Sequence, residues 1–371
     1  MRVGIDAREL GGRPTGVGRY LREVLVRWQA DPACHGADLI LFTPDPGLAA
    51  RWAAVGTAGA RLTWEHLPGR GGTLWEQHRL ARAALLARLD VFFAPAYTAP
   101  LRLDAPSVLS LHDVSFAAHP EWFSWRHGLR LRRLAHWSAR RAHTVITLTE
   151  FSAAEICAHF GVPRERIRPI PLAVDYHDAA PPPPRPAPPS PVVLFVGSIF
   201  ERRHLPVLVR ATAEARRHVP DLRLEVIGEN RTNPPQDLAG LAAELGIGQA
   251  VRLRDYVADQ ELTRAYAEAG AFAFLSEYEG FGLTPLEAMR HRLPSIVLDT
   301  PVAREVYGAG ARYVAKGDVG AVARALVELL QHPDVRAAQI AAGDRTVAQY
   351  RWERAARLTW EAIGHAAEGR R

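Results

Sequence analysis

The chain has 371 residues, which is more than one typical core needs and suits two domains. Apolar residues (48%) and charged residues (23%) are in the usual range for a globular protein, and only two cysteines occur, so a disulfide framework and a cysteine zinc site are not expected. The net charge of +6 comes almost entirely from arginine, because Lys316 is the only lysine, and it suits anionic partners without choosing among them. With no apolar run near the ~20 residues of a membrane span, and no leader pattern at the N-terminus, we expect a cytoplasmic protein.

Short apolar runs alternate with amphipathic stretches along both halves of the chain. Continuous apolar strands separated by helices predict an α/β fold, with parallel sheets covered by helices on both faces. Two of the amphipathic stretches are Val17–Trp28 and Leu205–His218. The strands predicted from these runs are Arg2–Asp6, Ala37–Phe42, Val91–Ala94, Ser107–Leu111 and Thr144–Leu148 in the first half, and Val192–Val196, Arg223–Ile227, Ala271–Phe274 and Ser295–Leu298 in the second.

A proline-rich run at 181–191 separates the two halves, since such a sequence neither pairs as a strand nor continues a helix. We therefore predict two doubly wound lobes, 1–178 and 191–349, joined by a linker at 179–190, with a cleft between the lobes. The segment 350–371 reads as a final helix that either packs on the second lobe or crosses back to the first. In such sheets, ligands bind beyond the carboxyl ends of the strands.

A glycine-rich loop follows the first predicted strand and precedes a helix. Gly16 and Gly18 let backbone amides approach phosphate oxygens, and a helix N-terminus adds a favourable dipole. The dinucleotide fingerprint fails because Leu21 stands where its third glycine belongs, and no P-loop lysine follows. The alternative reading is a plain turn before a helix.

Polar residues follow two further strands. His112 comes directly after a buried strand and is either a structural residue or a group that contacts a substrate hydroxyl. Ser198, Arg202 and Arg203 follow the strand Val192–Val196. An arginine there can hold a diphosphate through bidentate bonds, or it can simply be solvated at the surface.

The segment 276–287 reads S-E-Y-E-G-F-G-L-T-P-L-E and follows the strand Ala271–Phe274. Its two acids, Glu279 and Glu287, have the spacing E-x7-E. Thr284 as N-cap with Glu287 at the third helical position predicts a capping box, which gives Glu287 a structural explanation. Glu279 has no such explanation, and with the amides of 280–283 it can bind the hydroxyls and phosphates of a sugar diphosphate.

This segment resembles the signature of the family-4 retaining glycosyltransferases. I-D-A-R-E-L-G-G-R-P-T-G-V-G-R-Y-L at 5–21, L-H-D-V-S-F at 111–116, T-E-F-S at 149–152, G-S-I-F-E-R-R-H at 197–204 and V-I-G-E-N-R-T at 226–232 are similar to that family in order and spacing. The resemblance covers residues 1 to about 350. It implies a GT-B fold that binds the donor in the second lobe and the acceptor in the first.

The resemblance also implies residue roles. Arg203 stands where the family has lysine and would bind the donor diphosphate, while Ser198 replaces a second phosphate-binding arginine. His112 would approach the transferred sugar, which Glu279 would bind by its hydroxyls, so the implied catalytic residues are His112, Glu279 and Arg203. The residues implied to bind the donor are Gly16, Gly18, Ser198, Arg203, Val257, Glu279, Gly280, Phe281, Gly282, Leu283 and Glu287, with Glu287 on the ribose and Val257 on the base.

The implied reaction is front-face transfer with retention, in which the protein positions the substrates and stabilises charge. No D-x-D occurs, so neither a metal nor a cofactor is expected besides the GDP- or UDP-linked sugar donor. The pattern is similar to bacterial mannosyltransferases of polysaccharide biosynthesis, with a glycan or lipid-linked acceptor. The alternatives are a GT-B nucleotide-sugar epimerase and a non-catalytic nucleotide or sugar receptor; no motif supports nucleic acid as a partner.

The stretch 125–143 is rich in arginine, contains two tryptophans and has no acid. One reading is a peripheral helix on the anionic inner face of a membrane, where lipid-linked acceptors lie. The other is a solvated helix between two strands.

Overall fold

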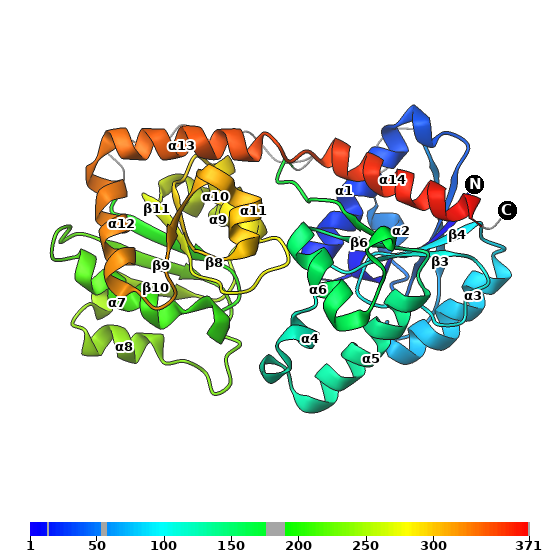
Figure 1. The fold of residues 1–371 in the computed structure, drawn as a ribbon, viewed down its shortest axis with the longest axis horizontal. Helices are drawn as coiled ribbons and strands as arrows, with labels where there is room; N and C mark the ends of the chain where they lie inside the picture. The colour runs from blue at the N-terminus through cyan, green and yellow to red at the C-terminus, as the bar shows by residue number, and fades with distance from the viewer. Residues whose placement is uncertain (13–14, 53–57, 176–189, 370–371) are drawn as a thin grey trace. The chain divides into compact units, whose positions relative to one another are not determined.

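The computed structural model describes residues 1–12, 15–52, 58–175 and 190–369, and it contains two compact units. Unit 1 comprises residues 1–177 together with 351–371, and unit 2 comprises 178–350. The proline-rich linker predicted at 179–190 lies outside the described residues except for Ser190. Each unit is an α/β layer structure built on one parallel sheet (Figure 1).

Unit 1 has a seven-stranded sheet in the order β3-β2-β1-β4-β5-β6-β7, and every pairing is parallel. Its strands are β1 (Arg2–Asp6), β2 (Asp38–Thr43), β3 (Arg61–His66), β4 (Val91–Ala94), β5 (Ser107–Ser110), β6 (Thr144–Thr147) and β7 (Ile167–Pro169). Its helices are α1 (Gly16–Ala30), α2 (Leu48–Arg51), α3 (Ala81–Leu86), α4 (Ser115–Ala118), α5 (Trp125–Arg141), α6 (Glu150–Phe160) and α14 (Trp352–Glu368).

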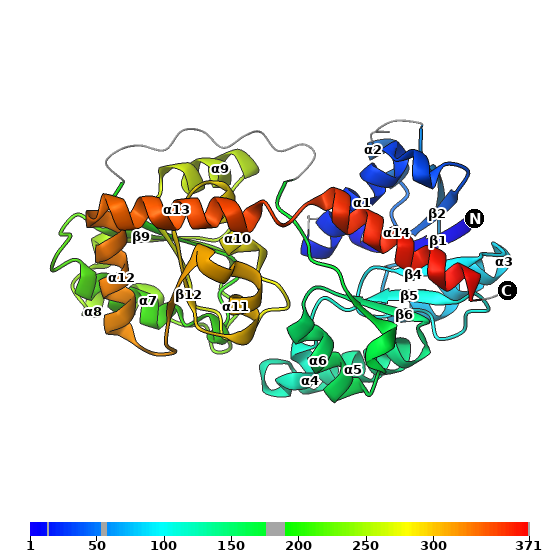
Figure 2. The same ribbon diagram turned by 45° about the horizontal axis from the view of Figure 1, so that its top comes forward.

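The terminal helix α14 packs within unit 1, alongside α1 (Figures 1 and 2). The Trp28 indole Nε1–H donates to the carbonyl of Ala356 at 2.9 Å, and the indole ring lies 5.3 Å from that of Trp360. Trp352 is fully buried in the same interface. Burial of large aromatic rings therefore holds together two segments more than 300 positions apart in the chain.

Unit 2 has a six-stranded sheet in the order β10-β9-β8-β11-β12-β13, again with parallel pairings throughout. Its strands are β8 (Val192–Val196), β9 (Arg223–Ile227), β10 (Val251–Arg254), β11 (Ala271–Phe274), β12 (Ser295–Leu298) and β13 (Ala311–Val314). Its helices are α7 (Leu205–Ala215), α8 (Leu238–Glu244), α9 (Asp259–Glu268), α10 (Leu283–Arg290), α11 (Pro301–Tyr307), α12 (Val319–Gln331) and α13 (Pro333–Val347).

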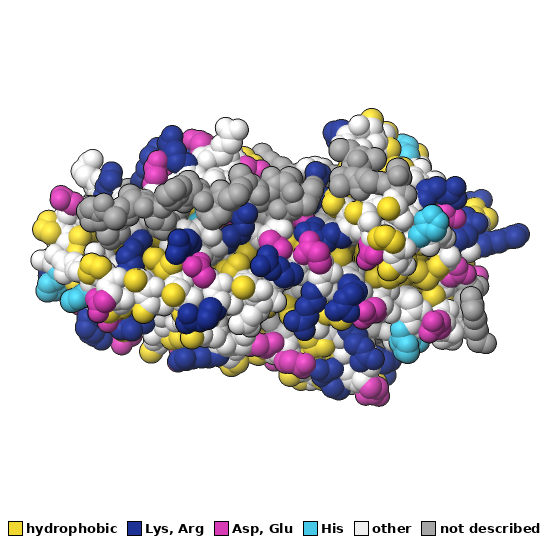
Figure 3. All heavy atoms as spheres, turned by 90° about the horizontal axis from the view of Figure 1, so that it is seen from above, with side chains coloured by type: hydrophobic (Ala, Val, Ile, Leu, Met, Phe, Trp, Pro, Cys, Tyr) yellow, Lys and Arg dark blue, Asp and Glu magenta, His cyan; other side chains and the backbone are white. Residues whose placement is uncertain are grey.

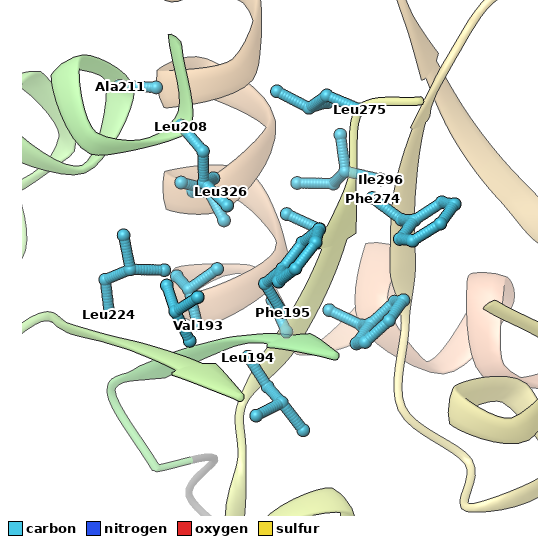
Figure 4. Packing of buried hydrophobic residues seen from close by; sticks show 14 of the residues in the cluster. Val193, Leu194, Phe195, Leu208, Ala211, Leu224, Phe274, Leu275, Ile296 and Leu326 are labelled. Carbon is cyan, nitrogen blue, oxygen red and sulfur yellow. The ribbon is translucent and has the colours of Figure 1, made fainter. Parts of the chain in front are cut away.

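The core of unit 2 forms where the central strands meet α7 and α12. Phe195 of β8 stacks on Phe274 of β11 at 5.7 Å, while Leu208 and Leu326 approach from the two helices (Figure 4). β8 and β11 are buried along nearly their whole length, as strands of a sheet covered on both faces should be. This core fixes the two strands whose carboxyl ends carry the most specific sequence motifs.

None of the described helices has both the length and the apolarity that crossing a bilayer requires. On the face of the molecule in Figure 3, basic and acidic side chains are interspersed and do not form one large patch of a single sign.

Candidate functional site

In the parallel sheet of unit 2, the order in which the chain adds strands reverses between β8 and β11. From β8 the chain continues to β9 and β10 on one side, then crosses to β11 and continues to β12 and β13 on the other. The loops that follow β8 and β11 therefore diverge, and the space between them is where doubly wound sheets bind ligands. These two loops contain Ser198 and Arg203 on one side and the segment 276–282 on the other.

Arg203 and Glu279 meet at this switch point. Nε and Nη2 of Arg203 donate to the same Glu279 oxygen, Oε1, at 3.2 and 2.9 Å. Ser276 Oγ also donates to this oxygen, at 2.8 Å. The side chains of Arg203 and Glu279 are 13% and 20% exposed, so the pair is largely shielded but remains within reach of a ligand.

The opposite end of the Arg203 guanidinium is also fixed. Nη1 donates to the Ser198 carbonyl at 2.8 Å, and the group lies 4.8 Å from the centre of the Phe274 ring. Gly197 makes room for it, because a Cβ there would lie 2.5 Å from Nη1. These bonds engage three of the five guanidinium N–H groups of Arg203 and hold the guanidinium in one orientation. The other two N–H groups can donate to a ligand.

The predicted capping box is wrong. Helix α10 begins at Leu283 after an N-cap Gly282 in the left-handed region (φ 82°), and no side chain caps it. Thr284 lies inside the helix, and its buried Oγ1 has no hydrogen-bond partner among the described residues. The helix starts early because Tyr307 fixes Gly282: its hydroxyl donates to the Gly282 carbonyl at 2.9 Å and would lie 2.0 Å from a Cβ there.

Glu287 therefore has no capping role. Its Oε2 accepts a hydrogen bond from the Tyr266 hydroxyl at 3.2 Å, and its side chain is half-buried. Phe281 is buried against Tyr350, with ring centroids 5.3 Å apart. Val257, implied to touch the base, belongs to the hydrophobic core of unit 2 and is 6% exposed.

A second charged group in the same loop was not singled out from the sequence. Glu277 Oε2 pairs with Lys316 Nζ and with His204 Nε2, the latter at 3.2 Å. Partial burial opposes ionisation, yet Lys316 and His204 together lower the pKa of Glu277. In the sequence, only the neighbouring E-x7-E spacing pointed to this loop. The partners of Glu277 could not be recognised, because His204 lies 73 positions before it and Lys316 lies 39 positions after it.

In unit 1 the switch point lies between β1 and β4, and the glycine loop follows β1. Thr15 is the N-cap of α1, and its Oγ1 accepts from the Gly18 amide at 2.9 Å. A Cβ on Gly18 would lie 2.4 Å from the Glu9 carbonyl, so helix packing alone requires this glycine. Gly16 has no atom within 4 Å of its would-be Cβ, so nothing in the described structure requires a glycine there.

Two buried carboxylates at this edge were missed by the sequence analysis. Asp6 and Glu76 are 2% and 1% exposed and share the guanidinium of Arg8, whose Nε lies 2.8 Å from Asp6 Oδ2. Thr98 Oγ1 donates to Glu76 at 2.6 Å. Burial opposes the charge on Arg8, but the two carboxylates raise its pKa above the usual value. The separation of Asp6 and Glu76 by 70 positions concealed the network.

His112 is 7% exposed at the end of β5, between the rings of Tyr20 and Tyr97 at 5.4 and 5.8 Å. Its Nε2 lies 2.8 Å from the Pro95 carbonyl, so Nε2 carries the proton of this bond. Burial lowers the pKa of His112, which keeps the ring neutral near neutral pH. The neutral tautomer has its lone pair on Nδ1, where it can accept a hydrogen bond from a hydroxyl.

The structure thus brings together Arg203, Ser198 and Glu279 in unit 2, with residues 280–283 beside them and Glu287 on the helix that follows. His112, Gly16 and Gly18 all lie beyond strand ends of unit 1. Within the described part of the chain, no three His, Cys, Asp or Glu side chains are grouped so as to hold a metal ion.

Known proteins match both halves of the chain. Residues 14–178 match the family model "Glycosyltransferase Family 4", and residues 179–346 match "Glycosyl transferases group 1". The O-antigen chain mannosyltransferase B of Escherichia coli is 27% identical over 364 residues, which are 91% of this chain and 93% of that protein. The D-inositol 3-phosphate glycosyltransferase of Kineococcus radiotolerans is 31% identical over 254 residues, 62% of this chain and 58% of that enzyme.

Two solved structures share the fold across almost the whole chain. Anabaena HepE, solved in complex with UDP and glucose, has a TM-score of 0.73 at 18% identity, and the match covers 98% of this chain and 100% of the HepE chain. WaaG, a glycosyltransferase involved in lipopolysaccharide biosynthesis, has a TM-score of 0.69 at 17% identity, with 98% and 99% coverage. The fold is that of the GT-B glycosyltransferases. Both halves of the chain thus match glycosyltransferase models, family 4 in the amino-terminal half and group 1 in the carboxyl-terminal half.

Proposed function

We propose that this glycosyltransferase moves a hexose, mannose in the first instance, from a nucleotide diphosphate to a glycan or lipid-linked acceptor with retention of configuration. The observation that carries the proposal is the oriented Arg203–Glu279 pair at the switch point of unit 2. Similarity to an O-antigen mannosyltransferase over nearly the full chain favours mannose. UDP in the structural neighbour HepE keeps UDP-sugars as the other donor class.

In this proposal Arg203 neutralises the donor diphosphate with its two remaining N–H groups, helped by the amides of 280–283 at the start of α10. Glu279 accepts hydrogen bonds from the sugar hydroxyls, and Glu287 from the ribose. In unit 1, Nδ1 of His112 serves a sugar hydroxyl. The leaving phosphate takes the acceptor proton, so the protein supplies orientation and positive charge and needs neither a metal nor a cofactor.

Calorimetric titration with GDP and, separately, UDP tests the donor site. We expect GDP to bind more tightly than UDP. We also expect Glu287→Ala to bind GDP at least tenfold more weakly than wild type does, because a carboxylate that accepts a hydrogen bond from a hydroxyl contributes about 1.5–3 kcal/mol. Glu268→Ala is the matched control, since this helical carboxylate is 68% exposed and pairs with Arg264 on the same helix. Stronger binding of UDP would discard mannose, and no binding of any nucleoside diphosphate would contradict the transferase.

Turnover separates the remaining functions. Release of GDP from GDP-mannose only when acceptor is present, with an α-linked product by NMR, supports retaining transfer. Conversion of the free nucleotide sugar without acceptor would indicate an epimerase, and tight donor binding without turnover would indicate a receptor.

We further propose that α5 contacts an anionic membrane surface. Trp125 and Trp137 are 73% and 53% exposed on this acid-free helix, and Leu74 nearby is 76% exposed. A groove of about 390 Å³ runs along α5 between Trp125 and Leu134 and contains three arginines. Exposed indole rings beside arginines suit the interface of an anionic bilayer. Cosedimentation with vesicles containing phosphatidylglycerol, lost in Trp125→Ser/Trp137→Ser, tests it; equal pelleting of wild type and variant would reject it.

A further inference from the structure

Unit 1 contains a pocket of about 600 Å³ that the proposed transfer does not use. Its walls come from the segments 100–107, 141–144 and 165–168 and from His365 of α14, and we call it the basic pocket. Ser107 and Thr144 are the first residues of β5 and β6, so the pocket lies at the amino-terminal edge of the sheet. His112 follows the carboxyl end of β5, at the opposite edge. The volume is in the range of small-molecule sites.

Positive charge dominates the lining of the basic pocket. Arg141, Arg166 and Arg168 face a single carboxylate, that of Glu165. None of these three guanidinium groups forms an ion pair with any acid in the described parts of the chain, whereas Arg203 and many other arginines do. Three arginines without a carboxylate partner around one concavity make a strong local field for an anion.

The three arginines are nevertheless held in place. Arg141 donates to the Leu101 carbonyl, Arg166 donates to the carbonyls of Arg140 and Ala142 at 3.2 Å each, and Arg168 donates to the Glu165 carbonyl at 3.0 Å. Each of these bonds is made through Nη1, so Nε and Nη2 of each group retain donors. Guanidinium groups anchored on backbone lose little entropy on binding, and their planar donors match phosphate oxygens.

The rest of the lining suits a ring attached to that anion. Leu101 and Leu103 give apolar wall, and the imidazoles of His143 and His365 lie 5.5 Å apart in an edge-on arrangement. Burial lowers the pKa of His143, and the positive charges of His365 and Arg166 lower it further. The His143 ring therefore stays neutral and can donate or accept a hydrogen bond at neutral pH.

We propose that the basic pocket binds a small phosphate-bearing molecule, a sugar phosphate or a nucleotide, at a site separate from the donor site of unit 2. The arginines bind the phosphate, and the apolar and imidazole walls contact the attached ring. The amino-terminal edge of the sheet thereby carries a second ligand site. This proposal does not depend on which sugar or nucleotide the enzyme transfers.

The test uses the full-length chain and calorimetric titration with two monophosphate probes, glucose 6-phosphate and inorganic phosphate, which lack the diphosphate proposed to bind Arg203. Arg168→Ala removes an exposed guanidinium whose one side-chain hydrogen bond to a described residue goes to the carbonyl of Glu165, so it should leave the fold intact. Arg102→Ala is the matched control: it removes the same charge from an exposed arginine that belongs to the segment 100–107 but does not line the pocket. Arg203→Gln reports on the donor site.

We expect at least one probe to bind, and Arg168→Ala to weaken it about tenfold or more, as expected for a lost charged hydrogen bond. Arg102→Ala and Arg203→Gln should leave that binding unchanged. An equal loss in Arg168→Ala and Arg102→Ala would reduce the effect to net charge and overturn the proposal. Loss in Arg203→Gln alone would assign the binding to unit 2 and overturn the proposal, and so would absence of binding by both probes up to about 10 mM.

Discussion

Replacing Glu279 by glutamine should separate nucleotide binding from sugar transfer. The glutamine oxygen still accepts from Arg203 and Ser276, so the loop keeps its hydrogen bonds while the site loses one negative charge. A phosphate on the remaining donors of Arg203 would lie roughly 6–7 Å from this oxygen, given usual hydrogen-bond lengths on both sides of the guanidinium. At an effective dielectric of about 20, the repulsion removed is roughly 2.5 kcal/mol.

The exposed fractions of 13% and 20% leave some solvent screening, so we expect a net gain of about 1–2 kcal/mol. GDP should therefore bind about five- to thirtyfold more tightly to Glu279→Gln. The kcat/KM for GDP-mannose should fall at least tenfold, because charge-assisted bonds to the sugar hydroxyls contribute about 1.5–3 kcal/mol.

Calorimetry with GDP and initial rates with GDP-mannose measure the two effects. Glu277→Gln is the matched control, since it removes a charge two residues away whose partners are Lys316 and His204. If Glu279→Gln weakens GDP and GDP-mannose equally, Glu279 acts through Arg203 alone and the assignment to the sugar is wrong. If Glu277→Gln tightens GDP to the same extent, the gain reflects net charge and not this pair.

Three further changes test other parts of the structure. Glu287→Gln should weaken GDP about tenfold while changing the melting temperature little, because Glu287 caps no helix; a large loss of stability would contradict this. As the pH falls below 6.5, unfolded His112 gains a proton that the native ring resists, so the free energy of unfolding should fall with pH, and it should fall less steeply in His112→Asn when urea unfolding is measured between pH 5 and 7. Gly18→Ala should destabilise by about 1–3 kcal/mol through its clash with the Glu9 carbonyl, whereas Gly16→Ala should unfold like wild type; a loss of kcat/KM in Gly16→Ala alone would show a functional role.

The central strands of both sheets could be predicted from the sequence, and the edge strands could not. β1, β4, β8, β9, β11 and β12 have the predicted bounds, because most residues of each strand are buried and apolar residues predominate in them. The missed strands are β3, β7, β10 and β13, which form the four outer edges of the two sheets. Partly exposed strands such as β3 and β10 lack this pattern, and only pairing with a neighbour identifies them.

The site followed the same rule at the level of single residues. Positions in the loops after buried strands, such as His112 and Glu279, could be placed in the fold from the sequence because a strand end fixes where its loop begins. Their partners could not be found, since the residues that meet at a switch point come from strands that are adjacent in space and distant in sequence. Arg203 and Glu279 are 76 positions apart, and the sequence gives no sign that they share hydrogen bonds.

The error at α10 shows why a local motif can mislead about function. Thr284, Pro285 and Glu287 satisfy the pattern of a helix start, yet the helix begins at Leu283 because Tyr307, from α11, holds the Gly282 carbonyl. A tertiary hydrogen bond thus overrides the local capping preference. The consequence concerns function: Glu287 caps no helix, and its Oε2 instead accepts a hydrogen bond from Tyr266 of α9, so the capping pattern does not explain why a carboxylate stands at this position.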